Sequence, residues 1–174
     1  MRSCKPSDTL NEKVGFGGGC HWCTEAVFEA LRGVGQVEQG FISAAPPHDA
    51  FSEAVVVHFD PGMIGLVDLI EIHLRTHAST SQHALRTKYR SAVYVYSRHQ
   101  AREATAILSE LQRLFSRPLV THVLDFVGFK PSESKFLHYF EKNGGNQFCE
   151  RYIDPKLERL RADYARFAIS PTSE

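Results

Sequence analysis

A strand-like segment, three consecutive glycines and a helix-like segment follow one another between residues 12 and 33. The stretch from Glu12 to Phe16 is predicted to form a strand, and the stretch from Thr24 to Arg32 a helix that ends at Gly33. The glycines at 17–19 permit a tight connection, because a residue without a side chain accepts conformations that other residues avoid. The fold must therefore contain a strand–helix unit with Cys20 at its junction.

Cys20 stands where a cysteine is placed to react. Unpaired backbone N–H groups at a helix start favour the thiolate, which is the nucleophilic form of the side chain. The neighbouring Trp22 offers an apolar wall beside the sulfur. Cys20 and Cys23 also form a Cys-x-x-Cys pair, a pattern found in thiol oxidoreductases but weakly specific on its own. The sequence thus predicts sulfur chemistry at this junction.

The rest of the chain alternates between strand-like and helix-like patterns. Up to residue 96 the predicted order is βαββαβ, a ferredoxin-like split βαβ arrangement. Beyond it we expect a long helix, a further strand and two more helices, which together make an α/β protein, an α+β two-layer sandwich with additional C-terminal helices. The predicted elements after the first helix are strands at 34–42, 52–59 and 91–96, a helix containing Leu66 to Leu74, a helix at 98–115, a strand at 119–127, a helix from about Ser132 and a short helix after Pro155.

Length and charge limit the classes to which the protein can belong. The 174 residues are predicted to form a single domain (1–174), with a flexible leader at 1–11 and a C-terminal tail at 143–174. The 20 basic and 20 acidic residues cancel, so no overall field would recruit nucleic acid or a membrane. No apolar run is long enough for a secretory signal or a membrane span. The four cysteines lack the spacing of a disulfide framework, and we expect a cytoplasmic protein with reduced or redox-active thiols.

Four segments in order resemble one known family. The stretch from Gly17 to Glu25 is similar to the Gly-Cys-Phe-Trp-Cys/Gly-x-Glu signature of A-type peptide methionine sulfoxide reductases. The stretches at 52–55 and 87–92 resemble the family's His-Ala-Glu-Ala-Val and Thr-Gln-Tyr-Arg-Ser-Ala segments. Phe148-Cys149, followed by residues 153–156, is similar to the Tyr-Cys and Ile-x-Pro-Lys tail of many members. The matches run from about residue 14 to 167, nearly the whole chain.

The resemblance implies reduction of methionine S-sulfoxide, free or in proteins, through a cysteine sulfenic acid and an intramolecular disulfide. It assigns Cys20 as nucleophile, Glu53 as proton donor, Tyr89 as a hydroxyl donor to the oxygen and Cys149 as the resolving thiol, with Trp22 as a wall for the substrate methyl group. Thioredoxin, or dithiothreitol in vitro, is the implied reductant. The resemblance implies neither a bound cofactor nor a metal, and we expect a monomer. The chemistry is coherent, since a sulfoxide oxygen must gain protons as its bond to sulfur breaks.

Three substitutions depart from the family pattern. His21 stands where the family usually has the Phe of the methyl pocket, and Phe41 replaces a Tyr. Ala84 stands at the spacing of the family's active-site Asp. Each lost donor around a reacting oxygen can cost on the order of a hundredfold in rate. We hypothesise that His21, a titratable substrate-binding residue, partly replaces the lost Tyr and Asp.

Several alternatives remain open at this stage. Cys23 is a possible alternative resolving cysteine in place of Cys149. The substrate can be another small sulfoxide, or the protein can be a non-catalytic thiol redox sensor on the same fold. Metal binding by the thiols together with His73, His77 and His83 is a weaker hypothesis, because no second Cys-x-x-Cys is present.

Overall fold

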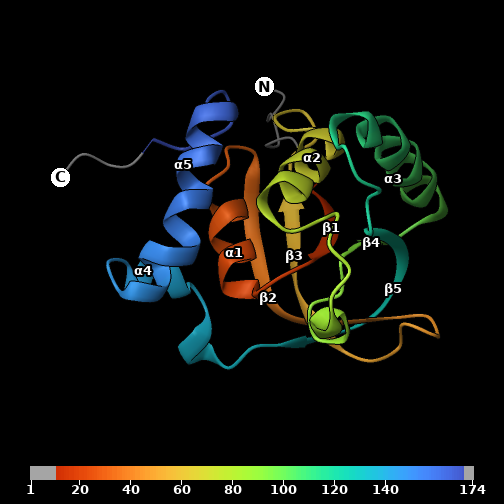
Figure 1. The fold of residues 1–174 in the computed structure, drawn as a ribbon, viewed down its shortest axis with the longest axis horizontal. Helices are drawn as coiled ribbons and strands as arrows, with labels where there is room; N and C mark the ends of the chain where they lie inside the picture. The colour runs from red at the N-terminus through yellow and green to blue at the C-terminus, as the bar shows by residue number, and fades with distance from the viewer. Residues whose placement is uncertain (1–10, 171–174) are drawn as a thin grey trace, which may run out of the picture.

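The computed structural model describes residues 11–170. Most of the predicted leader, including Cys4, lies outside these residues. The described part contains five strands, β1 (Glu12–Gly17), β2 (Val34–Ala44), β3 (Ser52–Phe59), β4 (Ala92–Val95) and β5 (His122–Pro131). Its α-helices are α1 (His21–Glu29), α2 (Leu66–Thr76), α3 (Arg98–Leu111), α4 (Tyr139–Asn143) and α5 (Asp154–Asp163) (Figure 1). Short helical turns are η1 (Ala84–Thr87), η2 (Gln112–Leu114), η3 (Ser134–Phe136) and the π-helical turn η4 (Cys149–Ile153).

The five strands form one closed sheet. The order is β1-β3-β2-β5-β4, and β4 pairs with β1 to close it. Four of the strands lie side by side in the order β4-β1-β3-β2, and each neighbouring pair is antiparallel. Two interleaved βαβ units, as in the predicted ferredoxin-like arrangement, produce this order. The mixed α/β class is confirmed, but the open two-layer sandwich is replaced by a closed sheet. The reason is β5, which pairs with both β2 and β4 and so removes the two free edges.

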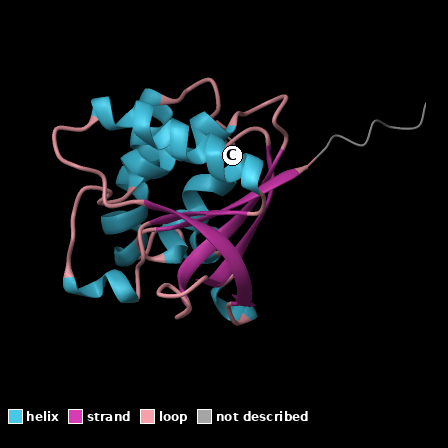
Figure 2. Ribbon diagram, turned by 90° about the vertical axis from the view of Figure 1, so that its right-hand side faces the viewer, coloured by secondary structure: helices cyan, strands magenta, loops and turns pink. Residues whose placement is uncertain are grey.

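The sheet separates two apolar cores. Along β3, Val55, Val57 and Phe59 face the main core, whereas Ala54 and Val56 face the interior of the closed sheet. This alternation follows from the period of two along a strand. The main core packs the sheet against α1, α2 and α3, and Figure 2 shows the helices gathered on one side of the strands. The strand and helix at residues 12–29 are therefore fixed between the sheet and the helical layer.

The C-terminal third differs most from expectation. No long helix starts at Ser132 in the described chain, because β5 extends to Pro131 and only the short η3 and α4 follow. The expected tail from residue 143 forms η4 and α5, which pack on α1. Cys149 is completely buried in this packing. The expected C-terminal tail is, in this structure, a helical segment packed against the strand–helix junction.

A membrane span requires about 20 apolar residues in a helix. Among residues 11–170, no helix combines the necessary length and apolar character.

Candidate active site

The nucleophile candidate, Cys20, occupies the position just before α1. Its carbonyl oxygen accepts hydrogen bonds from the backbone N–H groups of Cys23 at 3.1 Å and Thr24 at 3.2 Å, which begin the helix. The side chain is neither fully buried nor exposed. A close approach at the preceding loop requires glycine, because a Cβ atom on Gly18 would overlap the ring of His77. The glycine run thus allows the loop to pack directly on α2.

The surroundings of Cys20 favour its thiolate. A hydrogen bond from the Cys23 thiol is the main cause that lowers the pKa of Cys20, and backbone N–H groups of Trp22 and Cys23 contribute in the same direction. Burial and the nearby Glu53 carboxyl oppose this effect. The Cys23 pKa is raised, because its thiol donates that hydrogen bond and is itself buried. These opposite shifts favour the thiolate at Cys20 and keep the proton on Cys23 beside it.

Glu53, on β3, lies next to the start of α1. It is 9% exposed, and its Oε2 accepts the backbone N–H of His21 at 3.1 Å. The His21 ring is buried, with Nδ1 2.8 Å from the carbonyl oxygen of Gly40 and Nε2 3.8 Å from Glu53 Oε2. Because a carbonyl only accepts, His21 Nδ1 carries the proton in this hydrogen bond. His21 therefore holds the carboxyl through its backbone and faces it with its ring.

Lys88 is a site residue that the sequence analysis missed. Its Nζ lies 3.8 Å from Glu53 Oε1, and its side chain is 61% exposed. A hydrogen bond with Tyr89 is the main cause that raises the pKa of Lys88, followed by the charges of Tyr89 and Glu53. Lys88 thus interacts with both residues that are predicted to donate a proton or a hydrogen bond to the sulfoxide oxygen, Glu53 and Tyr89. The available signal was Lys88 itself, which stands in the segment where the family pattern has Gln.

Trp22 and Phe41 occupy different surroundings. Phe41 contacts the His21 ring edge-on, with centroids 5.2 Å apart. Trp22 stacks on Tyr139 with centroids 4.0 Å apart and planes at 5°, and its other ring neighbours are Phe136 and Phe148. The structure thus brings Cys20, His21, Glu53 and Phe41 into one neighbourhood. Trp22, expected as a free wall for the substrate, is covered by the C-terminal segment.

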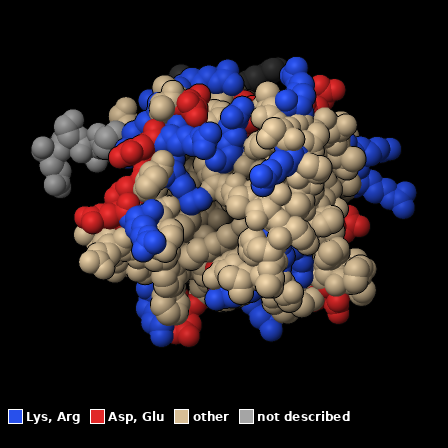
Figure 3. All heavy atoms as spheres, viewed as in Figure 1, with Lys and Arg blue, Asp and Glu red and all other residues tan. Residues whose placement is uncertain are grey.

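A cavity of about 520 Å³ opens beside the Cys20 side chain. Tyr89 lines it, together with Cys23, His77 and the aromatic rings of Phe148 and Tyr152. Viewed as in Figure 3, uncharged side chains surround a hollow near the middle of this face, with lysine and arginine side chains above it. A methionine side chain is apolar apart from its oxidised sulfur, so a cavity with apolar walls and a thiolate at its edge suits it.

The three described cysteines meet in one cluster. Cys23 and Cys149 are buried together with Ala26, Ile153 and Leu157, and Cys20 packs against this group. All three are free thiols. The structure brings both candidate resolving cysteines close to the reactive one, and Cys23 is the one whose thiol bonds to Cys20.

His73 and His77 are held by hydrogen bonds inside the fold. His73 Nε2 lies 2.8 Å from the Gly17 carbonyl oxygen, and His77 Nε2 lies 2.8 Å from Ser91 Oγ. Burial lowers the pKa of His73, and it lowers that of His77 to about 4. Both rings are therefore neutral at pH 7 and tie α2 to the glycine loop and to the start of β4.

The neutral state of His77 predicts a loss of stability in mild acid. A histidine in the unfolded chain takes up its proton near pH 6.5, whereas folded His77 does so only at about pH 4. The neutral His77 ring therefore contributes fully to the free energy of unfolding above pH 6.5. This contribution, about 3 kcal/mol, is lost as the pH falls from 6.5 to 4. Urea unfolding at pH 7 and 4.5 measures it.

Two variants separate His77 from other titrating groups. His77→Gln is expected to reduce the loss, whereas the exposed His99→Gln should leave it unchanged. An equal loss in wild type and His77→Gln would show that burial of His77 is not its cause.

The sequence is similar to a known family and to curated relatives. Residues 12–167 match the family model described as peptide methionine sulfoxide reductase. The peptide methionine sulfoxide reductase MsrA of Thermus thermophilus is 35% identical over 158 residues, covering 83% of this chain and 90% of the relative. MsrA of Deinococcus radiodurans is 35% identical over 169 residues, covering 88% of this chain and 82% of the relative.

Solved structures share the fold at lower identity. The reduced form of Mxr1 from Saccharomyces cerevisiae has a TM-score of 0.72 at 20% identity, and the alignment covers 85% of this chain and 94% of that one. Mxr1 in complex with Trx2 has a TM-score of 0.61 at 19% identity, covering 79% and 91%. At this identity the likeness shows the fold alone.

Proposed function

The chain belongs to the peptide methionine sulfoxide reductase family, and on that premise we propose how its residues reduce the S epimer of methionine sulfoxide, free or in proteins. The protein is an oxidoreductase that uses thiols as the electron source. The observation that carries the proposal is a cysteine held toward its thiolate form beside a buried carboxyl and an apolar cavity.

The first step forms a sulfenic acid. The Cys20 thiolate attacks the sulfoxide, the S–O bond of the substrate breaks, and the oxygen remains on Cys20 as methionine leaves. The oxygen must gain a proton for this exchange, which a positioned acid supplies. In the proposal Glu53 donates that proton, while the Tyr89 hydroxyl and the Lys88 ammonium stabilise the developing negative charge.

His21 has a positioning role in this scheme. Its backbone N–H holds Glu53 Oε2 at 3.1 Å, and its ring is fixed by the carbonyl of Gly40. The polar ring thus faces the carboxyl, with Nε2 3.8 Å from Oε2, and Phe41 supplies the apolar contact beside the ring. This geometry supports the hypothesis that His21 compensates in part for the donors missing at Phe41 and Ala84.

The second step releases water and forms a disulfide. The Cys23 thiol attacks the sulfenic acid of Cys20, water leaves, and a Cys20–Cys23 bond forms. Cys149 then attacks Cys23, which returns Cys20 as a thiol and leaves a Cys23–Cys149 disulfide. The thiol contact between Cys20 and Cys23 supports this order, and the shared cluster of Cys23 and Cys149 supports the transfer.

The order of disulfides gives a separate prediction. After one equivalent of sulfoxide and no reductant, peptide mapping of the wild type is expected to find Cys23 joined to Cys149, and mapping of Cys149→Ser to find Cys20 joined to Cys23. A Cys20–Cys149 disulfide in both the wild type and Cys23→Ser would instead make Cys149 the direct resolving residue, as the family resemblance alone implies.

Thioredoxin is the proposed physiological reductant. One of the similar structures is that of Mxr1 in complex with Trx2, and thiol–disulfide exchange with an external dithiol suits a chain that ends its cycle oxidised. We propose that the protein works as a monomer in the cytoplasm with no bound cofactor, where reduced thiols like its three described cysteines persist. Its role there is the repair of methionine residues after oxidative stress.

Single-turnover stoichiometry tests the scheme without any reductant. Protein mixed with one equivalent of methionine S-sulfoxide is expected to form one methionine per chain and to lose two thiols. With excess sulfoxide the Cys20 thiol that the scheme returns reacts once more, so the total is two methionines per chain. Catalytic consumption without a thiol source, or no methionine at all, would contradict it.

A further inference from the structure

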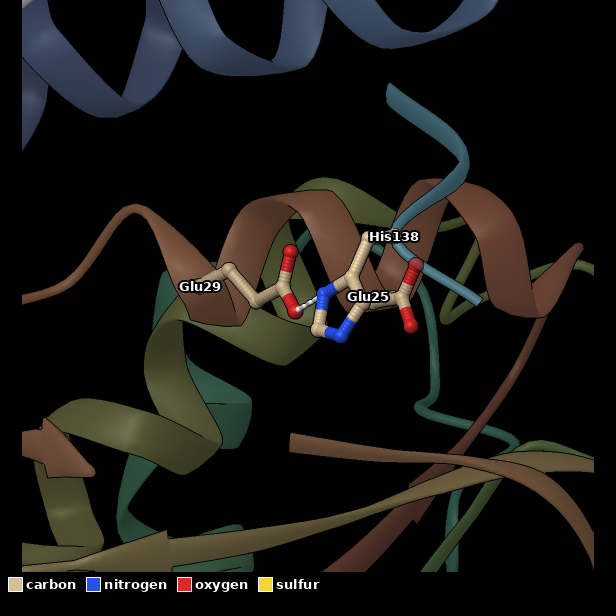
Figure 4. Close-up of side chains that lie close together, drawn as sticks. All are labelled: Glu25, Glu29 and His138. Atoms are coloured by element: carbon tan, nitrogen blue, oxygen red, sulfur yellow. Dashed lines mark hydrogen bonds and ion pairs between the residues drawn. The ribbon is translucent and has the colours of Figure 1, made fainter. Parts of the chain in front are cut away.

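Outside the active site, two carboxylates and an imidazole meet at the far end of α1. One donor atom from each of Glu25, Glu29 and His138 lies within 4.8 Å of the others. His138 Nδ1 is 2.7 Å from Glu29 Oε1 (Figure 4). Glu25 and Glu29 are one helical turn apart, so both side chains point from the same face of α1. His138 comes from the segment just before α4 and adopts a left-handed conformation (φ 53°).

Two buried oxygens beside this cluster lack partners among the described residues. Glu25 is 1% exposed, and its Oε1 accepts the backbone N–H of Tyr139 at 3.1 Å while its Oε2 has no partner. Gln39 is also 1% exposed, and its Oε1 has none. Both residues line one cavity of about 390 Å³, together with Glu29 and His138. A buried acceptor without a donor is costly, and a bound cation would satisfy it.

The charges around this cavity favour a cation. Among its described lining residues, the ionisable ones are Glu25, Glu29, Glu38 and His138, and none is Lys or Arg. Glu38 is paired with His58 at 2.6 Å, which leaves the two α1 carboxylates facing one histidine. Two carboxylates held this close repel each other unless positive charge lies between them.

We propose that Glu25, Glu29 and His138 form a binding site for a divalent transition metal ion, with Zn²⁺ as the best match. One imidazole nitrogen and two carboxylate oxygens are a donor set that zinc accepts, at about 2.0–2.2 Å from the ion. A tetrahedral ion would place the donors about 3.4 Å from one another, so the 2.7 Å contact between His138 Nδ1 and Glu29 Oε1 would open and any donor pair farther apart, up to 4.8 Å, would close. The His138 side chain is 50% exposed and that of Glu29 28%, so the ion can enter from solvent.

A bound ion would tie the C-terminal segment to α1. His138 immediately precedes Tyr139, which stacks on Trp22 at 4.0 Å. The metal would therefore fix the contact that covers Trp22, next to the reactive Cys20. Since Trp22 is the only tryptophan of the chain, its fluorescence reports on this contact.

The experiment compares metal binding by matched variants. The chelator-treated full chain is titrated with ZnCl₂ by calorimetry and with CoCl₂ by absorption, alongside His138→Ala, Glu29→Gln and Glu141→Gln. Glu141 lies on α4 near Glu29 but is not one of the three donors, so its variant controls for loss of a nearby charge. Cobalt distinguishes the ligands, because thiolates give a sulfur-to-metal charge-transfer band that imidazole and carboxylate do not.

The wild type and Glu141→Gln are expected to bind one more Zn²⁺ per chain than His138→Ala and Glu29→Gln, or to bind it at least about tenfold more tightly. That added Zn²⁺ should also change Trp22 fluorescence, and the Co²⁺ bound at the site should show no charge-transfer band. Equal binding by all four proteins, or cobalt spectra that carry only the thiolate band, would overturn the proposal. So would the absence of any Zn²⁺ binding by the wild type.

Discussion

Replacing Cys20 with serine is expected to reduce sulfoxide turnover by about a thousandfold or more. A serine hydroxyl is far less acidic than a thiol, so the hydrogen bond from Cys23 and the backbone N–H groups cannot convert it to the anion. It also cannot accept the oxygen and pass it on as water by disulfide formation. The rate of methionine production with dithiothreitol measures the effect.

Cys149→Ser is the matched control for that variant. It also exchanges one sulfur for oxygen, but it leaves the first step intact, so it should still release one methionine per chain without reductant. Because Cys149 is completely buried, circular dichroism and thermal melting should accompany both variants. Residual single-turnover activity in Cys20→Ser would mean that another thiol attacks the sulfoxide.

Replacing Glu53 with glutamine is expected to reduce kcat by about 10²- to 10⁴-fold. The amide oxygen can still accept the N–H of His21, so the local geometry is kept, but an amide does not supply an acidic proton. The loss should appear in the rate of methionine release in a single turnover, because it concerns the S–O cleavage step. Later disulfide exchange should be unchanged.

Glu103→Gln provides the comparison for Glu53→Gln. Glu103 lies on α3, and its contact is an exposed ion pair with His99 at 3.9 Å. The same charge change there should leave kcat unaltered. A Glu53→Gln enzyme with wild-type single-turnover rates would remove Glu53 from the proton-transfer step and leave Tyr89 or Lys88 to supply it.

Local patterns in the sequence predicted most of the elements, because they depend on neighbouring residues. β3 was predicted with its observed ends, since its Val-rich run is bounded by turn residues. The closure of the sheet was not predictable, because the pairing of β5 with both β2 and β4 joins segments far apart in sequence. Alternation shows which face of β5 is apolar but does not identify its neighbours.

The same distinction between local sequence patterns and contacts across the fold applies to the candidate site. Cys20 was recognisable from its place between glycines and a helix, which is a local feature. The link from Lys88 to Glu53, and the position of His138 beside Glu25 and Glu29, depend on contacts across the fold. The burial of Cys149 was also not predictable, because the sequence suggested only a C-terminal tail at 143–174, whereas the packing of η4 on α1 is set by tertiary contacts.

Consumption of the two epimers of L-methionine sulfoxide by the purified protein, with dithiothreitol as reductant, tests the central claim most directly. We predict catalytic consumption of the S epimer alone, lost in Cys20→Ser. In the proposed mode of binding the apolar walls and the proton donors take different substituents of the sulfur, so we expect one epimer alone to place its oxygen toward Glu53 and Tyr89. Equal consumption of both epimers would contradict this geometry, and consumption of neither would show that the changes at His21, Phe41 and Ala84 have altered the substrate or ended catalysis.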